Sequence, residues 1–193
     1  SFEHSVGPIS LFYRYCIDMN TIYIKMDDDI VFIDDKAILE LVKYRTEHPE
    51  YFLVYSNTLV NVIGNYLQQR MGNLTTDLGI CTTDESCPVA WRSSLFAEYV
   101  HETVIQKYKD GTLDEFKFDQ WILLGRESMS INFCCWFGKD LWNAGHESPT
   151  NDEVTLSKLI PLRLNKFNAV CGQSLVVHYG YMAHRNALLR QDL

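Results

Sequence analysis

Three consecutive aspartates, Asp27, Asp28 and Asp29, stand between two apolar runs in the segment YIKMDDDIVF, residues 23–32. The flanking runs are rich in β-branched residues, so we expect strands over 21–26 and 30–33 with an acidic turn between them. Three adjacent carboxylates repel one another unless a cation is close. A strand that ends in carboxylates presents them at a sheet edge, where open α/β folds bind ligands. The segment therefore predicts a site for a hard divalent cation.

A polar turn, in which aspartate side chains accept from nearby backbone N–H groups, is the simpler alternative for this segment. A calcium loop of the EF-hand type is excluded. Its sixth position, counted from Asp27, would be Phe32 instead of glycine, and its twelfth would be Ile38 instead of glutamate.

The remaining chain mixes strand and helix signals. We expect further strands over 51–55, 130–137 and 174–178. We expect helices from about 36 to 48, from 94 to 108 and from 152 to about 159, and a long irregular excursion over 57–91. This order predicts one domain, residues 1–193, with an α/β fold in which helices cover a mixed, partly parallel sheet.

Charge narrows the classes of partner. The chain has 17 Lys and Arg residues against 25 Asp and Glu residues, a formal charge of -8, and no basic run interleaved with aromatic residues, so nucleic acid is not expected. An anionic substrate would approach such a surface against repulsion unless a bound cation offset it. No apolar stretch of about 18 residues is free of charge, so we expect no transmembrane segment.

The six cysteines include no C-x-x-C pair, which disfavours a cysteine zinc site. Cys81 and Cys87 flank a polar loop, and two states stay open for them, a disulfide in an oxidising compartment or free thiols. Asn73 begins an Asn-Leu-Thr pattern for N-glycosylation, which has meaning only in a secretory lumen.

Four segments together resemble glycosyltransferases of the GT-A fold, especially fungal-type members. NTIYIKMDDDIVFIDDKAI is similar to their Asp-x-Asp segment, SINFCCWFG and NDEVTLSKLIP to their late region with an acidic pair at a helix start, and SLVVHYGYMAHR to their closing strand. The resemblance spans nearly the whole chain. It implies a GT-A-like α/β/α sandwich and the transfer of a sugar from a nucleotide-sugar donor, UDP- or GDP-linked, to a hydroxyl group of a glycan, lipid or protein.

The resemblance also implies a metal and donor site. Mn²⁺ or Mg²⁺ would be held by Asp27, Asp29 and His178, and the donor diphosphate would be contacted by Asp27, Asp28 and Arg185. His178 and Arg185 each have an alternative structural interpretation. His178 could be a core histidine bonded to a backbone carbonyl, and Arg185 could cap a helix end.

Asp152 and Glu153 form the expected catalytic pair at the helix start. In an inverting transfer the acceptor hydroxyl loses its proton as it attacks, and Asp152 is placed to act as the base. Thr150-x-x-Glu153 is a capping box, which explains Glu153 by structure alone. Trp136 and Trp142, on either side of Gly138, are expected to contact the acceptor.

The front of the chain departs from the family pattern, because 26 residues precede Asp27 where GT-A enzymes have a longer nucleoside-binding part. We expect that part to be missing or short, so that the chain is the carboxyl-terminal part of a longer enzyme or a shortened relative. The resemblance leaves open whether such a shortened chain transfers sugar.

Two other functions stay open. Asp27-x-Asp29-x-Val31 fits the nucleophile motif of haloacid-dehalogenase-type phosphatases, although no downstream Gly-Asp-x-x-x-Asp completes their metal site. A non-catalytic remnant of a transferase that binds carbohydrate or a protein partner is the third reading. We expect the lumen of the secretory pathway, as for Golgi enzymes, with the cytoplasm as the alternative.

Overall fold

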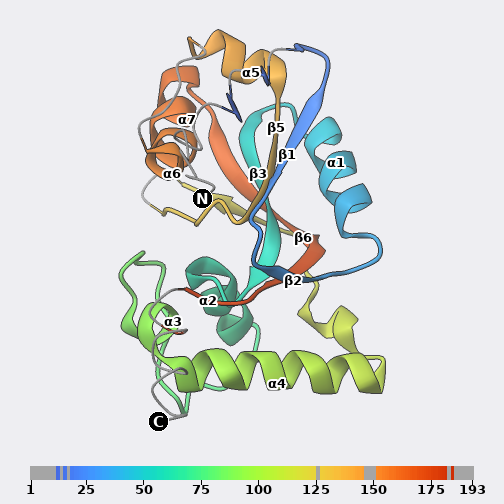
Figure 1. Ribbon diagram of the computed structural model, residues 1–193, viewed down its shortest axis with the longest axis vertical. Coiled ribbons are helices and arrows are strands. Elements are labelled where there is room, and N and C mark those ends of the chain that lie inside the picture. The colour runs from blue at the N-terminus through green and yellow to red at the C-terminus, as the bar shows by residue number, and fades with distance from the viewer. Residues whose placement is uncertain are drawn as a thin grey trace, which may run out of the picture.

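The computed structural model describes residues 12–13, 15–16, 18–124, 127–145, 151–181 and 184. In this part of the chain, strands form one sheet with helices against both faces (Figure 1). The strands are β1 (Ile22–Met26), β2 (Ile30–Ile33), β3 (Tyr51–Leu59), β4 (Gln120–Leu123), β5 (Phe133–Phe137) and β6 (Phe167–His178). The helices are α1 (Ala37–Glu47), α2 (Val62–Arg70), α3 (Pro88–Arg92), α4 (Ser94–Asp110), α5 (Gly138–Asn143), α6 (Asp152–Val154) and α7 (Ile160–Leu164), with a 3₁₀ turn η2 (Leu113–Phe116) and a π-helical turn η3 (Thr155–Leu159).

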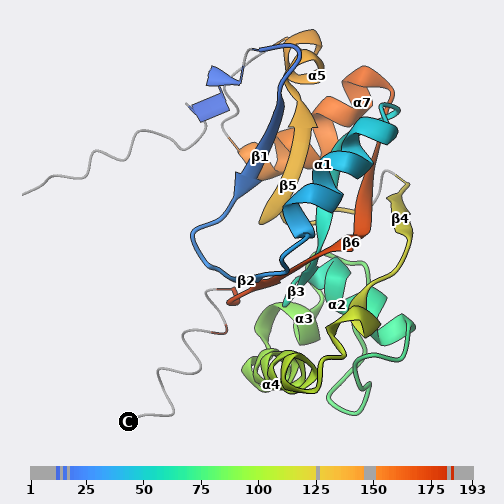
Figure 2. The same cartoon turned by 90° about the vertical axis from the view of Figure 1, so that its right-hand side faces the viewer.

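The strand order is β1-β5-β3-β6-β2, and β4 pairs with the first half of β6. β3 and β6 run parallel, and the other described pairs are antiparallel. The sheet is therefore mixed, and the predicted α/β fold with a partly parallel sheet is confirmed. Figure 2 shows β2 beside the last part of β6. This pairing brings the turn after β1 next to the carboxyl-terminal end of β6.

Alternation along β5 shows how the two faces are covered. Cys134 packs in a cluster with Leu156 and Ile160 of the η3–α7 segment, whereas Cys135 packs in a cluster with Leu41 of α1. Successive side chains of a strand point to opposite faces, so α1 and α7 lie on opposite sides of the sheet (Figure 1). Because both faces are covered, every residue of β3 is buried.

The predicted irregular excursion over 57–91 is wrong in part, because it contains the end of β3 and the helices α2 and α3. Ser56, Asn57 and Thr58 look like loop residues but lie buried in β3. The Ser56 hydroxyl lies 2.7 Å from that of Ser174, and the Asn57 amide donates to the carbonyl oxygen of Phe116 at 2.9 Å. The Thr58 hydroxyl donates to the carbonyl oxygen of Ser56 at 3.2 Å, so all three polar groups have partners and burial costs little.

Other predicted boundaries shift without changing the type of element. The strand predicted over 130–137 begins at Phe133, and the strand predicted over 174–178 begins earlier, at Phe167. The cap of α4 is Ser93, whose hydroxyl accepts from the N–H of Phe96 at 3.2 Å. This helix ends at Gly111, which has a φ of 70°, a left-handed conformation that favours glycine.

Candidate active site

Carboxylates from two distant segments line one cavity of about 600 Å³. Asp27 and Asp28 come from the β1–β2 turn, and Asp152 and Glu153 come from the start of α6. Lys25, Asn132 and Trp136 also contribute to the wall. The sequence predicted the two acidic groups separately, and the fold places both in the same cavity.

The end of β6 reaches the acidic turn directly. His178 Nε2 lies 3.1 Å from Asp29 Oδ2, and the N–H of Tyr179 donates to the carbonyl oxygen of Asp29 at 2.8 Å. On the other side of the ring, His178 Nδ1 lies 3.2 Å from the carbonyl oxygen of Val60. Asp29 and His178 are therefore neighbours although they lie near opposite ends of the chain.

The ring contacts of His178 restrict what can lie between it and Asp29. The Val60 carbonyl can only accept, so Nδ1 carries the hydrogen of this bond. In a neutral ring Nε2 is then an acceptor that faces a carboxylate oxygen. Two acceptor atoms, His178 Nε2 and Asp29 Oδ2, then face each other. Either a proton on Nε2 or a metal cation bound by both atoms removes their repulsion.

The spacing of these two groups fits a small divalent cation. With metal–ligand bonds of about 2.1 Å at right angles, two ligand atoms lie about 3 Å apart. The Nε2–Oδ2 distance of 3.1 Å matches that value. In the part of the chain that the structure describes, no group of three or more His, Cys, Asp or Glu side chains is placed to hold a metal. Mg²⁺ is commonly held by one or two protein carboxylates, with phosphate and water oxygens completing the octahedron.

Asp27 has other partners than those the sequence suggested. Its Oδ1 accepts from the ammonium group of Lys25, and its Oδ2 accepts from the amide of Asn132 at 2.9 Å. The Asn132 side chain in turn accepts from the amide of Asn61 at 2.9 Å. Lys25 supplies a cation to the acidic turn, so repulsion among the aspartates is relieved in part without a metal. The role of Asp27 as a metal ligand stays a prediction.

The start of α6 corrects the expected capping box. Asn151 is the N-cap, and its side chain accepts from the N–H of Val154 at 3.0 Å, so Glu153 lies in the second helical position and has no capping function. Thr150 lies outside the described residues. The structural explanation of Glu153 was therefore wrong, and its carboxylate remains available for chemistry.

The two carboxylates of α6 differ in their surroundings. Asp152 Oδ2 accepts from the hydroxyl of Tyr13 at 2.9 Å. Glu153 is exposed as a whole residue, although nearby protein atoms partly desolvate its carboxyl group. Burial raises the pKa of this carboxyl group, Asp152 and Asp27 raise it further, and a hydrogen bond with Ser130 partly opposes the shift.

The structure separates the two tryptophans expected at the acceptor. Trp136 lines the cavity, but it is only 2% exposed and packs against the rings of Tyr13 and Tyr23, with centroids 5.8 Å and 6.3 Å away. Trp142 lies on α5, after the end of β5 that pairs with the start of β1. It is thus at the other end of β1 from Asp27, and the structure does not bring it to the cavity.

Several predicted features lie elsewhere. Arg185 is outside the described residues. Cys81 and Cys87 are both buried free thiols, and burial raises the pKa of Cys81 to about 12. The side-chain nitrogen of Asn73 donates to Gln68 and to the carbonyl oxygen of Glu115, both at 2.8 Å. Its glycosylation stays a prediction.

The sequence prediction missed Lys25, Asn132 and Tyr13, which bind the carboxylates of the cavity. Lys25 could have been found, because side chains two residues apart on a strand share one face and Asp27 follows at that spacing. Tyr13 and Asn132 gave no comparable signal, since their contacts depend on the fold.

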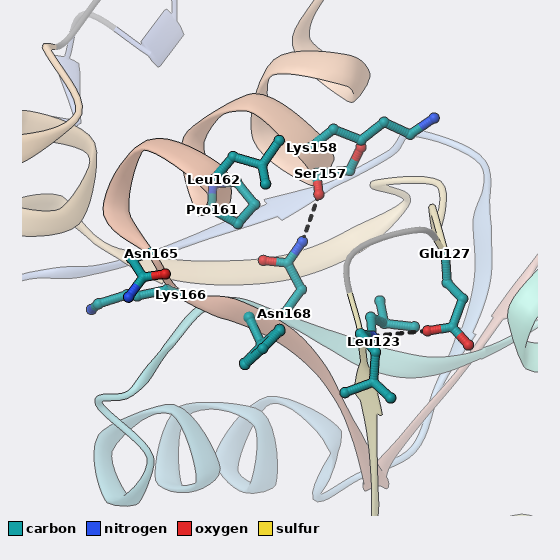
Figure 3. Close-up of a pocket in the computed structure, with 11 residues that line it drawn as sticks. Leu123, Glu127, Ser157, Lys158, Pro161, Leu162, Asn165, Lys166 and Asn168 are labelled. Carbon is teal, nitrogen blue, oxygen red and sulfur yellow. Dashed lines mark hydrogen bonds between the residues drawn. The ribbon is translucent and has the colours of Figure 1, made fainter.

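A further hollow of about 260 Å³ lies between the end of β4 and α7. The amide of Asn168 donates to the carbonyl oxygen of Ser157 at 2.8 Å (Figure 3), and its oxygen accepts from the N–H of Leu53 at 3.2 Å. Asn168 thus joins β6 to β3 and to the π-helical turn, a structural role. This hollow contains none of the predicted site residues.

No protein-family model, curated protein or solved structure matches this chain. Within the described residues, no helix is both long and apolar enough to cross a membrane.

Proposed function

We propose that this protein is a metal-dependent glycosyltransferase that moves a sugar from a nucleotide-sugar donor, UDP- or GDP-linked, to a hydroxyl acceptor. The observation that carries the proposal is that the acidic turn contacts both other groups: Asp27 and Asp28 share one cavity with the acidic pair of α6, and Asp29 lies against His178 at the end of β6. Sugar transfer needs two opposed functions, a cation for the departing diphosphate and a base for the attacking hydroxyl. The acidic turn with His178 offers candidates for the first, and the acidic pair of α6 offers candidates for the second.

Asp29 and His178 are the residues that would hold Mn²⁺ or Mg²⁺, given their spacing and the acceptor character of Nε2. A bound divalent cation would neutralise charge on the departing diphosphate. Lys25 adds a fixed positive charge beside Asp27 in the wall of the cavity. Together these groups would offset the net negative charge of the protein, which otherwise repels a nucleotide.

Glu153 is the better candidate for the base, in place of Asp152. A general base works best when its pKa approaches the working pH, and burial raises the pKa of the Glu153 carboxyl group above its ordinary value. Asp152 is held by the hydroxyl of Tyr13 and borders the same cavity, so it orients the site. Replacing Glu153 with Gln should lower turnover by about 10²- to 10⁴-fold, and replacing Asp152 with Asn should lower it less.

The metal site is tested by thermal shift with UDP, GDP or CMP, each with Mn²⁺ or Mg²⁺. A nucleotide at 100 times its dissociation constant should stabilise the protein by about 2.7 kcal/mol. This stabilisation should require metal and should disappear in Asp29→Asn and His178→Ala. Asp35→Asn, which removes an exposed acid from the same segment, is the matched control and should respond as the unmodified protein does.

Two outcomes would contradict the proposal. If Asp29→Asn and His178→Ala lower the melting temperature but leave the metal response unchanged, the two residues form only an ion pair. If the protein releases inorganic phosphate instead of nucleoside diphosphate, the phosphatase reading replaces the transferase. Release of nucleoside diphosphate that depends on metal and on an added hydroxyl acceptor supports the transferase.

A further inference from the structure

A second cavity, of about 230 Å³, adjoins the first at one residue. It is lined by Val62, Glu85, Trp91, Ser128, Ser130, Asn151, Glu153 and Val154. Glu153 is the only described residue that lines both cavities. The residue best suited to act as a base therefore borders two cavities, one with the acidic turn and one without it.

The second cavity combines one aromatic wall with short polar groups. Trp91 is 37% exposed, and Ser128, Ser130 and Asn151 line the cavity with hydroxyl and amide groups that each have at least one protein partner and further hydrogen-bonding capacity. A pyranose ring has the matching chemistry, because its C–H face is apolar and its edge carries hydroxyl groups. Lipid chains would instead need a wall that is largely apolar.

Trp91 is held in place before any ligand arrives. Its ring packs against Tyr181 with centroids 4.1 Å apart and an interplanar angle of 37°. Tyr181 is itself fixed, since its hydroxyl lies 3.4 Å from both the Ser130 hydroxyl and the N–H of Val62. A rigid aromatic surface loses little conformational entropy on binding, which favours affinity.

We infer that the second cavity binds the acceptor of the transfer and that this acceptor is a carbohydrate. The C–H face of a pyranose packs on Trp91, and the reacting hydroxyl lies at Glu153. Its oxygen bonds to the anomeric carbon of the donor sugar, its proton passes to the Glu153 carboxylate, and the diphosphate leaves with the electrons of the broken bond. This inference rests on the proposed function and narrows its acceptor from glycan, lipid or protein to a sugar.

Binding of methyl glycosides of glucose, galactose, mannose and N-acetylglucosamine, followed by saturation-transfer NMR without nucleotide, tests the inference. At least one glycoside should bind, and Trp91→Ala should weaken that binding tenfold or more. Tyr108→Ala, which truncates an exposed aromatic residue of α4, should bind as the unmodified protein does. Glycoside binding at Trp91 should also change the tryptophan fluorescence of the protein. Trp91→Phe keeps an aromatic face, so it should retain most of the binding but show no such fluorescence change.

The outcomes separate this inference from the proposed function. Absence of binding by all four glycosides, or equal binding by Trp91→Ala, overturns the carbohydrate site even if metal-dependent nucleotide binding is present. If Trp91→Ala fails to fold, Trp91→Phe is used instead. The carbohydrate site is then overturned if this variant binds glycoside with the same fluorescence change as the unmodified protein. Glycoside binding that depends on Trp91 supports the site, including in a protein that binds no nucleotide, which would then be a carbohydrate-binding remnant.

Discussion

Asp140 joins three elements of the fold through a buried ion pair. Its carboxylate accepts from Arg45 of α1 and, at 2.8 Å, from Lys166 just before β6. Arg45 is fully buried and Asp140 is 3% exposed. Burial lowers the pKa of the Arg45 guanidinium, and the charge of Asp140 opposes that shift. Replacing Asp140 with Asn would leave a buried cation without its anion.

The expected cost follows from these contacts. Removing one partner of a buried pair costs about 3–5 kcal/mol. Arg45 keeps two favourable contacts in the variant, a hydrogen bond to the His48 carbonyl at 3.1 Å and the face of Phe137 at 4.4 Å. We therefore expect the lower end, about 3 kcal/mol, which is a fall in melting temperature of roughly 6–12 °C for a chain of this size.

The assay is chemical and thermal denaturation of Asp140→Asn beside Glu115→Gln. Glu115 pairs with Lys107 at the surface, where an ion pair contributes less than about 1 kcal/mol. Adding Arg45→Met to Asp140→Asn should restore part of the loss, because the unpaired buried charge is then gone. The reasoning would be refuted if Asp140→Asn lost no more stability than Glu115→Gln.

Two further predictions concern a glycine and the proposed base. A Cβ on Gly64 would lie 1.8 Å from the carbonyl oxygen of Thr58, so Gly64→Ala should lower the free energy of unfolding by about 3 kcal/mol. Gly111→Ala meets nothing within 4 Å and should cost only about 1 kcal/mol for its left-handed conformation, and equal denaturation midpoints would contradict this difference. Folding raises the pKa of the Glu153 carboxyl group, so its ionisation lowers the free energy of unfolding. This loss of stability is absent below the pKa of the unfolded state and complete above the pKa of the folded state. Glu153→Gln should therefore raise the melting temperature more at pH 8 than at pH 4, and an equal rise at both values would count against the shift.

Local patterns in the sequence predicted much of the fold. The alternation around the acidic triplet predicted β1, the turn and β2, and the 3.6-residue period predicted α1 and α4, because local spacing alone decides which side chains share one face of such elements. The strand Phe133–Phe137 was expected for the same reason. The apolar period failed where distant groups satisfied polar side chains, as at Ser56 and Asn57 in β3.

The sequence by itself also determined which chemical groups the chain offers: a run of carboxylates after a strand, an acidic pair at a helix start and a histidine at a strand end. Only the tertiary structure decided which of them meet. It brought His178 to Asp29 and set Glu153 between two cavities, while it engaged Asp27 with Lys25 and left Trp142 at the far end of β1. The reason is that strand and helix periods depend on the nearest residues, whereas the pairing of β2 with β6 and the packing of α6 depend on contacts between segments far apart in the chain.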